Sequence, residues 1–236
     1  MGAFDDVAME QARPLPVIVL ADVSGSMAEE GKLDSLKHAL VDMIKSFQGA
    51  SSSNLEAEIW VGVYTFGGNS ATRLFDPMSA SAIAENEQLL SQINSLQASG
   101  GTPLGHALTA VADLLENKEQ YPSRAYRPFL VLASDGMPND EWEGPLDRLL
   151  NSERGKKATR LALSIGADAD DAMLKKYIGN EEIPVIKANN VDEIKRFFKC
   201  VTMSAIKSSQ SAKPGQLPAA EVVKMLVDDS DDLYGD

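Results

Sequence analysis

Apolar residues along the chain follow two alternating patterns, one typical of buried strands and the other of amphipathic helices. Continuous apolar runs occupy residues 16–21 and 129–133, and the mainly apolar residues 161–165 predict a further strand. Apolar residues with helical spacing occupy residues 33–47, 89–96, 104–115, 146–150, 173–177 and 191–201. Because the continuous runs are typical of strands buried on both faces, the alternation predicts a mainly parallel sheet covered by helices.

Two further segments predict the edges of this sheet. Residues 58–66 and 72–75 flank Gly67 and Gly68, a spacing that indicates a hairpin of two strands. Residues 183–186 predict another edge strand. The predicted fold class is therefore α/β: a doubly wound, mainly parallel sheet with helices on both faces and a short antiparallel edge strand.

The composition of the chain changes after Ile206, where Ser, Gln, Lys, Pro and Gly begin to predominate. This change predicts a folded domain over residues 14–206, an N-terminal extension over 1–13 and an acidic tail over 207–236. We expect the tail to be flexible, because it offers too little apolar surface to stay ordered alone. Within it, the apolar residues 219–227 favour a frayed helical turn, with a short docking peptide as the alternative.

Composition and charge exclude several classes of function. The formal net charge of −13 repels phosphate backbones and anionic lipids, so neither nucleic acid nor a membrane is an expected partner. No apolar run reaches the roughly 18 to 20 residues that cross a bilayer, and no secretory signal is visible. Cys200 is the single cysteine, which excludes an internal disulfide and a cysteine-based zinc site. We therefore expect a cytoplasmic protein, with Cys200 as a small apolar residue of the last helix.

Three clusters of oxygen-bearing residues fall at the ends of predicted strands or directly before a predicted helix. They are Asp22-Val23-Ser24-Gly25-Ser26, Gly100-Gly101-Thr102-Pro103 and Ser134-Asp135-Gly136. Ligands of open parallel sheets bind outside the carboxyl ends of the strands, where such loops converge. Hydroxyl and carboxylate oxygens from separate loops suit Mg²⁺, which requires near-octahedral oxygen coordination and keeps several waters. The clusters therefore predict a divalent-metal site.

The order of these clusters resembles the metal-ion-dependent adhesion site of the von Willebrand factor A family. The lead-in at residues 13–16 and the run at residues 22–27 are most similar to its bacterial TerY-like branch, which is associated with tellurite resistance and stress. The resemblance implies a Rossmann-like domain in which hydroxyls of three residues ligate the metal, namely Ser24, Ser26 and Thr102. It also implies that Asp22 and Asp135 act on the metal directly or through water.

Two features depart from the family pattern. Ser134 stands where Thr usually precedes the aspartate, a change that retains a hydroxyl. Some TerY-like chains also carry a cysteine-rich metal-binding C-terminus, which this sequence lacks, so the function of that module does not carry over.

The resemblance and the donor chemistry together predict a metal-dependent adaptor domain without enzymatic activity. Asp22 and Asp135 are the two anions in the predicted ligand set, so bound Mg²⁺ or Mn²⁺ stays electrophilic and favours a carboxylate from outside. The expected partner is therefore a protein that offers Asp or Glu to the metal. TerY-like proteins are often encoded beside protein kinases and phosphatases, which implies such a partner in a bacterial stress or tellurite-resistance complex.

Two alternative functions stay open. A Mg²⁺-dependent, aspartate-based phosphohydrolase also begins with a strand that ends in Asp, but it needs a second acid where this chain has Ser24. The sequence also lacks the motifs of a serine hydrolase, a P-loop and a dinucleotide-binding turn. In the other alternative, the metal is merely structural and the tail serves as a scaffold.

Several of these residues also have purely structural interpretations. Thr102 followed by Pro103 is typical of a helix start, with Thr102 as the N-cap. Asp140 either supports the site from outside the ligand set or starts a helix at residue 141. His38 and His106 lie on helical segments without another histidine or cysteine at ligand spacing, so we expect both to be structural or exposed.

Overall fold

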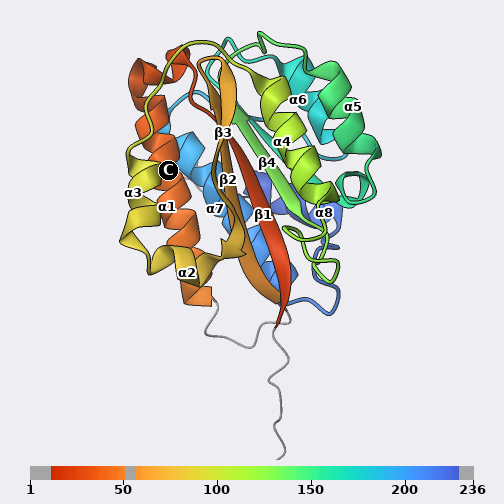
Figure 1. Cartoon of the computed structure of the whole chain (residues 1–236). Coiled ribbons are helices and arrows are strands. Elements are labelled where there is room, and N and C mark those ends of the chain that lie inside the picture. The colour runs from red at the N-terminus through yellow and green to blue at the C-terminus, as the bar shows by residue number, and fades with distance from the viewer. Residues whose placement is uncertain (1–11, 51–56, 229–236) are drawn as a thin grey trace, which may run out of the picture.

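The computed structural model describes residues 12–50 and 57–228, and within these residues six strands form one sheet. The strands are β1 (Arg13–Asp22), β2 (Ala57–Gly67), β3 (Ser70–Ser79), β4 (Phe129–Ser134), β5 (Thr159–Ile165) and β6 (Ile186–Ala188). Their order across the sheet is β3-β2-β1-β4-β5-β6, so β1 lies in the interior of the sheet (Figure 1). Neighbouring strands are parallel except for β2 and β3, which are antiparallel. The predicted fold class is confirmed.

Helices cover the two faces of this sheet (Figure 1). One layer contains α1 (Lys32–Ala50) and α7 (Val191–Ser209), which pack against each other, with the short helices α2 (Ala80–Ala84) and α3 (Glu87–Asn94) beside α1. The other layer contains α4 (Leu104–Glu116), α5 (Glu143–Asn151) and α6 (Asp171–Ile178). Within the described ranges, two 3-10 helices lie in connecting segments, η1 (Gly25–Gly31) and η2 (Gly155–Lys157).

The interior strands β1 and β4 place polar residues at one edge of the sheet. Both strands are buried along their length apart from Arg13, because helices cover both faces and leave no solvated side. Their last residues, Asp22 and Ser134, are polar. Since β1 and β4 are parallel, with Ala21 opposite Ala133, these two ends lie side by side at the carboxyl edge of the sheet. The fold therefore gathers the polar loops that follow these strands.

The edges of the sheet differ in part from the prediction. The edge strand expected at residues 183–186 is present, but its bounds are wrong, because β6 covers Ile186–Ala188 and pairs with β5. Pro184 lacks the amide hydrogen that a strand ladder uses, which explains the later start. The hairpin turn at Gly67 and Gly68 is confirmed, but β3 is longer than expected because its pairing with β2 continues through an irregular register to Ser79.

The chain after Ile206 continues as helix beyond the expected boundary. Helix α7 extends to Ser209, and a further helix, α8 (Ala219–Asp228), packs on it. Val222 is fully buried, and the thiol of Cys200 donates to the backbone oxygen of Met225 at 2.9 Å. The frayed turn favoured for this segment is therefore wrong, because α7 supplies the apolar partner that the tail itself lacks. The interpretation of Cys200 as a buried small residue of the last helix of the domain agrees with its position on α7.

The predicted domain limits stay predictions. Most of the extension over residues 1–13 lies outside the described residues, as does the acidic end of the tail at residues 229–236. The expected flexibility of residues 207–236 is a question for solution measurements, and α8 is the part of this tail that amide exchange would probe. Across the described ranges, no helix combines the length and apolarity needed to cross a membrane.

Candidate metal site

Three segments that are distant in sequence meet at the carboxyl edge of the sheet. The backbone amide of Gly25 donates to the oxygen of Gly100 at 2.9 Å, and that of Ser99 donates to the oxygen of Val23 at 2.8 Å. The amide of Gly68, in the turn between β2 and β3, donates to the oxygen of Ser99 at 2.6 Å. These bonds join the loop after β1, the hairpin turn and the loop before α4 into one connected backbone structure.

Glycine is needed where these segments approach each other most closely. Gly100 has a φ of 62°, and a Cβ at this position would lie 2.5 Å from the Cα of Gly68. A Cβ at Gly101 would lie 1.9 Å from the side-chain nitrogen of Asn139, in the loop after β4. A side chain at Gly100 would clash with the backbone, and one at Gly101 would displace the Asn139 side chain, so the Gly-Gly pair allows the loop to bring Thr102 next to the loop after β4.

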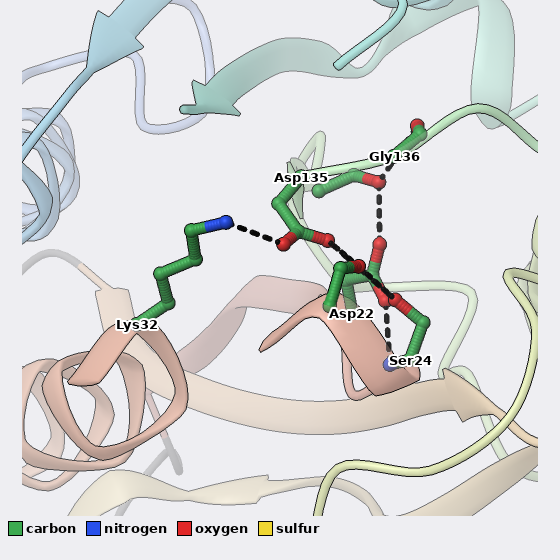
Figure 2. A network of polar contacts seen from close by, with 7 residues as sticks. Asp22, Ser24, Lys32, Asp135 and Gly136 are labelled. Carbon is green, nitrogen blue, oxygen red and sulfur yellow. Dashed lines mark hydrogen bonds and ion pairs between the residues drawn. The ribbon is translucent and has the colours of Figure 1, made fainter. Parts of the chain in front are cut away.

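Asp135, which directly follows β4, is held from two sides (Figure 2). Its side chain has no exposed surface. Its Oδ1 accepts hydrogen bonds from Ser26 Oγ at 2.7 Å and, at the longer distance of 3.5 Å, from Ser24 Oγ. Its Oδ2 lies 3.0 Å from the ammonium nitrogen of Lys32. One oxygen of the carboxylate therefore faces hydroxyl groups while the other faces a cation.

Asp22, the last residue of β1, is also fully buried. Its Oδ1 accepts a hydrogen bond from the amide of Ser24 at 2.8 Å, and its Oδ2 accepts one from Ser134 Oγ at 2.6 Å. Burial raises the pKa of the Asp22 carboxyl above its ordinary value; the hydrogen bonds from Ser134 and Ser24 oppose this rise, and the charge of Asp135 adds to it. A cation near the two carboxylates would relieve their repulsion.

Thr102 lies at this edge, but it is not the helix cap. Helix α4 begins at Leu104, with Pro103 in the N-cap position. A Cβ placed on Gly136 would lie 3.3 Å from Thr102 Oγ1, so the hydroxyl is close to the loop that carries Asp135. The interpretation of Thr102 as the N-cap and Pro103 as the first helical residue is therefore wrong. The Thr102 hydroxyl is thus not engaged in a cap.

The cap of α4 comes instead from Asp140, in the loop after β4. Its carboxylate accepts hydrogen bonds from the amides of Gly105 at 2.9 Å and His106 at 3.0 Å, and it lies 2.9 Å from His106 Nδ1. A carboxylate at this end of a helix also interacts favourably with the helix dipole. The expected start of a helix at residue 141 is wrong, since α5 begins at Glu143. Asp140 fixes the helix that follows Thr102.

The two histidines are exposed, which is one of the two outcomes expected for them. His38 is exposed on α1, and His106 is exposed on α4 beside Asp140. Neither belongs to a cluster of metal-binding side chains, because no group of three or more His, Cys, Asp or Glu residues gathers anywhere in the described ranges.

The residues at this edge fit a hard divalent cation. The structure brings all five predicted ligands to the carboxyl edge of the sheet: Asp22, Ser24, Ser26, Thr102 and Asp135. Carboxylate and hydroxyl oxygens from separate loops are the donors that Mg²⁺ and Mn²⁺ prefer. The hydrogen bonds from both serine hydroxyls to one oxygen of Asp135 bring neutral donors next to a charged one. The assignment of each residue as a ligand stays a prediction.

Two contacts of the site were missed at the level of sequence. Ser134 was noted only as a substitute for threonine, although its place at the end of β4, beside the end of β1, puts its hydroxyl within reach of Asp22. Lys32, which holds Asp135, is the first residue of α1, and no motif marks it. A parallel alignment of β1 with β4 is enough to find Ser134, whereas Lys32 needs the direction in which α1 leaves the loop.

Solved structures with the same fold include adhesive and matrix proteins. The pilus adhesin SpaC from Lactobacillus rhamnosus GG is 15% identical with a TM-score of 0.67, and the match covers 85% of this chain and 31% of SpaC. A von Willebrand factor type A protein from Catenulispora acidiphila is 18% identical with a TM-score of 0.64, covering 82% of this chain and 43% of its own.

A third similar structure is proximal thread matrix protein 1 from the mussel byssus, described with a zinc-occupied MIDAS motif. It is 18% identical with a TM-score of 0.63, and the match covers 83% of this chain and 48% of that protein. This chain therefore spans less than half the length of each of these three proteins. At these identities, the likeness shows the fold.

Comparison of the sequence itself with known proteins identifies the family. A comparison with curated proteins gives no significant match. The sequence pattern of the von Willebrand factor type A domain, in contrast, matches residues 17–199, a span that contains all five predicted ligands. Because the match covers most of the chain and agrees with the sheet order and the site at its carboxyl edge, the chain belongs to the von Willebrand factor type A domain family.

Proposed function

We propose that this chain is a protein-interaction domain whose bound metal ion grips an acidic side chain of a partner protein. The proposed ligands are Asp22, Ser24, Ser26, Thr102 and Asp135. Domains of this family commonly use a metal-ion-dependent adhesion site for protein interaction or adhesion. The observation that carries the proposal is the approach of two serine hydroxyls to one oxygen of a fully buried carboxylate, Asp135, with a second buried carboxylate nearby.

Mg²⁺ or Mn²⁺ is the proposed metal. All five proposed ligands bind through oxygen, without thiolate or imidazole, and this donor set suits hard cations that keep part of their water shell. The zinc-occupied motif of the mussel byssus protein supports a divalent metal at such a site in the family. It also makes Zn²⁺ the competitor against which selectivity should be measured.

The charge of the ligand set explains why an acidic partner is proposed. Asp22 and Asp135 supply two negative charges, and the three hydroxyl ligands are neutral, so the ion retains its attraction for another anion. Ser26 is exposed, whereas Asp22 and Ser24 are buried, so the site opens to solvent on the side of Ser26. The net charge of −13 opposes long-range attraction of an acidic partner. Recognition should therefore act at short range, at the metal.

The proposed role is not catalytic. A phosphohydrolase of the aspartate-based kind needs a second acid at the position of Ser24, and two of the similar structures named above are a pilus adhesin and a thread matrix protein. The alternative in which the tail serves as a scaffold loses support, because α8 packs on α7 with Val222 buried. A turnover assay with a generic phosphate ester and Mg²⁺ tests the enzymatic alternative directly.

Metal binding and metal-dependent capture test the proposal together. Calorimetric titration of the purified protein with MgCl₂ or MnCl₂ should give one site, and partner proteins from the source cells should be retained on the immobilised chain only with metal. Ser24→Ala combined with Ser26→Ala should lose both properties and keep the far-ultraviolet circular dichroism spectrum, because the core lies in the strands and helices.

Two exposed serines provide a matched control. The hydroxyls of Ser46 and Ser95 bond to carbonyls of their own helical segments, away from the site, so Ser46→Ala with Ser95→Ala should bind metal and partner normally. Partner retention that persists in chelator, or in the Ser24 and Ser26 double variant, contradicts the proposal. Tight Zn²⁺ binding that disappears in Cys200→Ser would instead move the metal to α7.

The biological setting of this activity rests on sequence resemblance. Membership of the TerY-like branch, a stress or tellurite-resistance complex, a kinase or phosphatase partner and a cytoplasmic location are further parts of the proposal. The motif at residues 22–27 supports the assignment to this branch, and the single cysteine supports the location. Identification of the proteins captured with metal, compared with chelator, tests these parts separately from the metal site.

A further inference from the structure

Lys32 places a fixed positive charge beside the proposed metal ligands. Its ammonium nitrogen lies 3.0 Å from Asp135 Oδ2, the carboxylate oxygen that the serine hydroxyls do not use. In Figure 2, Lys32 approaches Asp135 from the side of α1, while Asp22 and Ser24 lie on the other side of the carboxylate. Asp135 can therefore contact Lys32 and a metal at the same time, through different oxygens.

The backbone around Lys32 directs its side chain towards the site. Glu30 and Gly31, which precede it, both adopt left-handed conformations, with φ of 51° and 70°, and they turn the chain sharply into α1. Gly166, after β5, has a φ of 74°, and a Cβ there would lie 3.5 Å from the Lys32 nitrogen. The Lys32 side chain thus passes over a glycine on its way to Asp135.

The ammonium remains close to solvent as well as to the site. The side chain of Lys32 is 14% exposed, while that of Asp135 has no exposed surface. Lys32 also lines a pocket of about 210 Å³ together with Glu30 and Gly166. The ammonium therefore lies between solvent and a fully buried carboxylate of the proposed site, where its charge can act on both.

We propose that Lys32 determines the ligand specificity of the site by leaving the metal-loaded site with a net positive charge. This inference rests on the proposed metal-binding function. Two ionised carboxylates, Asp22 and Asp135, would bring the formal charge of a site with a divalent ion to zero, although the ion itself remains electrophilic, and the ammonium of Lys32 adds one positive charge. The loaded site therefore carries one positive charge and selects an anion, a carboxylate of the partner, over a neutral amide or hydroxyl.

The same charge must act on two binding steps with opposite signs. Lys32 repels the incoming metal ion, so it weakens metal binding. Once the metal is bound, Lys32 attracts the incoming carboxylate and strengthens the second step. A residue that merely supported the fold would weaken both steps, or neither, when it is replaced. The opposite signs are therefore the signature of the proposed role.

Lys32→Met tests this signature, because methionine retains an unbranched chain and loses the charge. Calorimetry with MnCl₂ measures the metal step. Water-proton relaxation of the Mn²⁺-loaded protein, titrated with acetyl-Gly-Asp-Gly-amide, measures the carboxylate step, and the Gly-Asn-Gly peptide measures selectivity. We expect Lys32→Met to bind Mn²⁺ about three- to tenfold more tightly and the Asp peptide about three- to tenfold more weakly. Its preference for Asp over Asn should fall accordingly.

Two further variants complete the experiment. Lys37→Met removes the same charge from the same helix, where Lys37 pairs with the exposed Asp34, and it should leave both steps unchanged. Lys32→Arg keeps the charge and should stay near wild type in both. If Lys32→Met shifts both affinities in one direction, or shifts neither, the proposed role of Lys32 is wrong while the metal site stands. Wild-type protein that binds no Mn²⁺ would overturn the metal-binding function itself, and the role of Lys32 with it.

Discussion

Two buried charges lie at opposite edges of the same sheet, and they differ in how their partners are supplied. Arg160 sits near the start of β5, where its Nε donates to the oxygens of Tyr177 and Ile178, each at 2.9 Å, and one terminal nitrogen donates to Gly155 at 2.7 Å. Asp135 lies beyond the end of β4. Its partners are two hydroxyls and the ammonium of Lys32.

The two arrangements have different electrostatic consequences. The partners of Arg160 are backbone carbonyls, including those at the end of α6 that a helix leaves without partners, so the guanidinium completes the fold. Burial lowers its pKa. At the other edge, two carboxylates lie close together, and burial raises the pKa of Asp22. Burial of a charge therefore does not by itself indicate a binding site. Two neighbouring buried carboxylates beside hydroxyl groups indicate one more specifically.

The largest expected effect in this comparison is the loss of Arg160. Arg160→Met leaves several buried carbonyls without donors, so we expect the free energy of unfolding to fall by about 2 to 4 kcal/mol. Urea denaturation of the metal-free and metal-loaded protein measures this change. The stabilisation by metal should stay as in wild type, because the hydrogen bonds of Arg160 go to carbonyls at the other end of the strands and to none of the proposed ligands. A loss of metal response in Arg160→Met would show that the edges are coupled.

Variants at the carboxyl edge of the sheet should show the opposite pattern, with a small effect on metal-free stability and a large effect on the stabilisation by metal. With metal at a hundredfold excess over its dissociation constant, a ligand that binds only the native state adds roughly 2.7 kcal/mol. Ser24→Ala with Ser26→Ala should lose this gain, while the metal-free double variant loses only about 1 kcal/mol, mainly from the buried hydroxyl of Ser24. Thermal unfolding with Mg²⁺ and with chelator gives both numbers. An intact metal gain in the double variant would rule out the serines as ligands.

A substitution of Thr102 should separate metal affinity from metal-free stability most clearly. Because Asp140 caps α4 and Thr102 does not, Thr102→Val should change the metal-free stability by less than about 0.5 kcal/mol. Metal affinity should fall by about tenfold, or roughly 1.4 kcal/mol, if its hydroxyl is a ligand. Asp140→Ala should instead remove the cap of α4 and lower the metal-free stability by about 1 kcal/mol. Equal metal affinity in Thr102→Val and wild type would remove Thr102 from the ligand set.

The smallest expected effect concerns pH in the metal-free protein. The pKa of Asp22 is raised in the folded state, so its stabilising contribution is fully present below the unfolded value of about 3.9 and is lost as pH rises through the folded value. Asp22→Asn cannot lose a proton. Its stability relative to wild type should therefore rise with pH across that window and then level off. Asp34→Asn, at an exposed position, is the control; the same pH dependence in both variants would refute a special role of Asp22.

Much of the fold followed from local patterns in the sequence. Interior strands such as β1 and β4 must be apolar on both faces, and their helices apolar on one, so periodicity alone separates them. The polar residues that end these strands also stand out against the apolar runs. Three polar clusters in order predicted a divalent-metal site, the family resemblance that they carry implied the five candidate ligands, and the structure brings these residues to one edge. Turns and edges were less certain, because one proline, Pro184, was enough to move the start of β6.

Only the tertiary structure decided which residues from elsewhere in the chain contact these ligands or hold the elements that carry them. Asp140 caps α4 across a gap of 34 or 35 residues, Ser134 bonds to Asp22 across 112, and Lys32 reaches Asp135 across 103. Such contacts depend on strand order and on the direction of helices, which no local pattern encodes. The docking of α8 on α7 has the same origin, since an apolar island acquires its structure only from the surface that covers it. The sequence determined which oxygen-bearing side chains the chain offers, and the packing of distant segments decided which of them lie together.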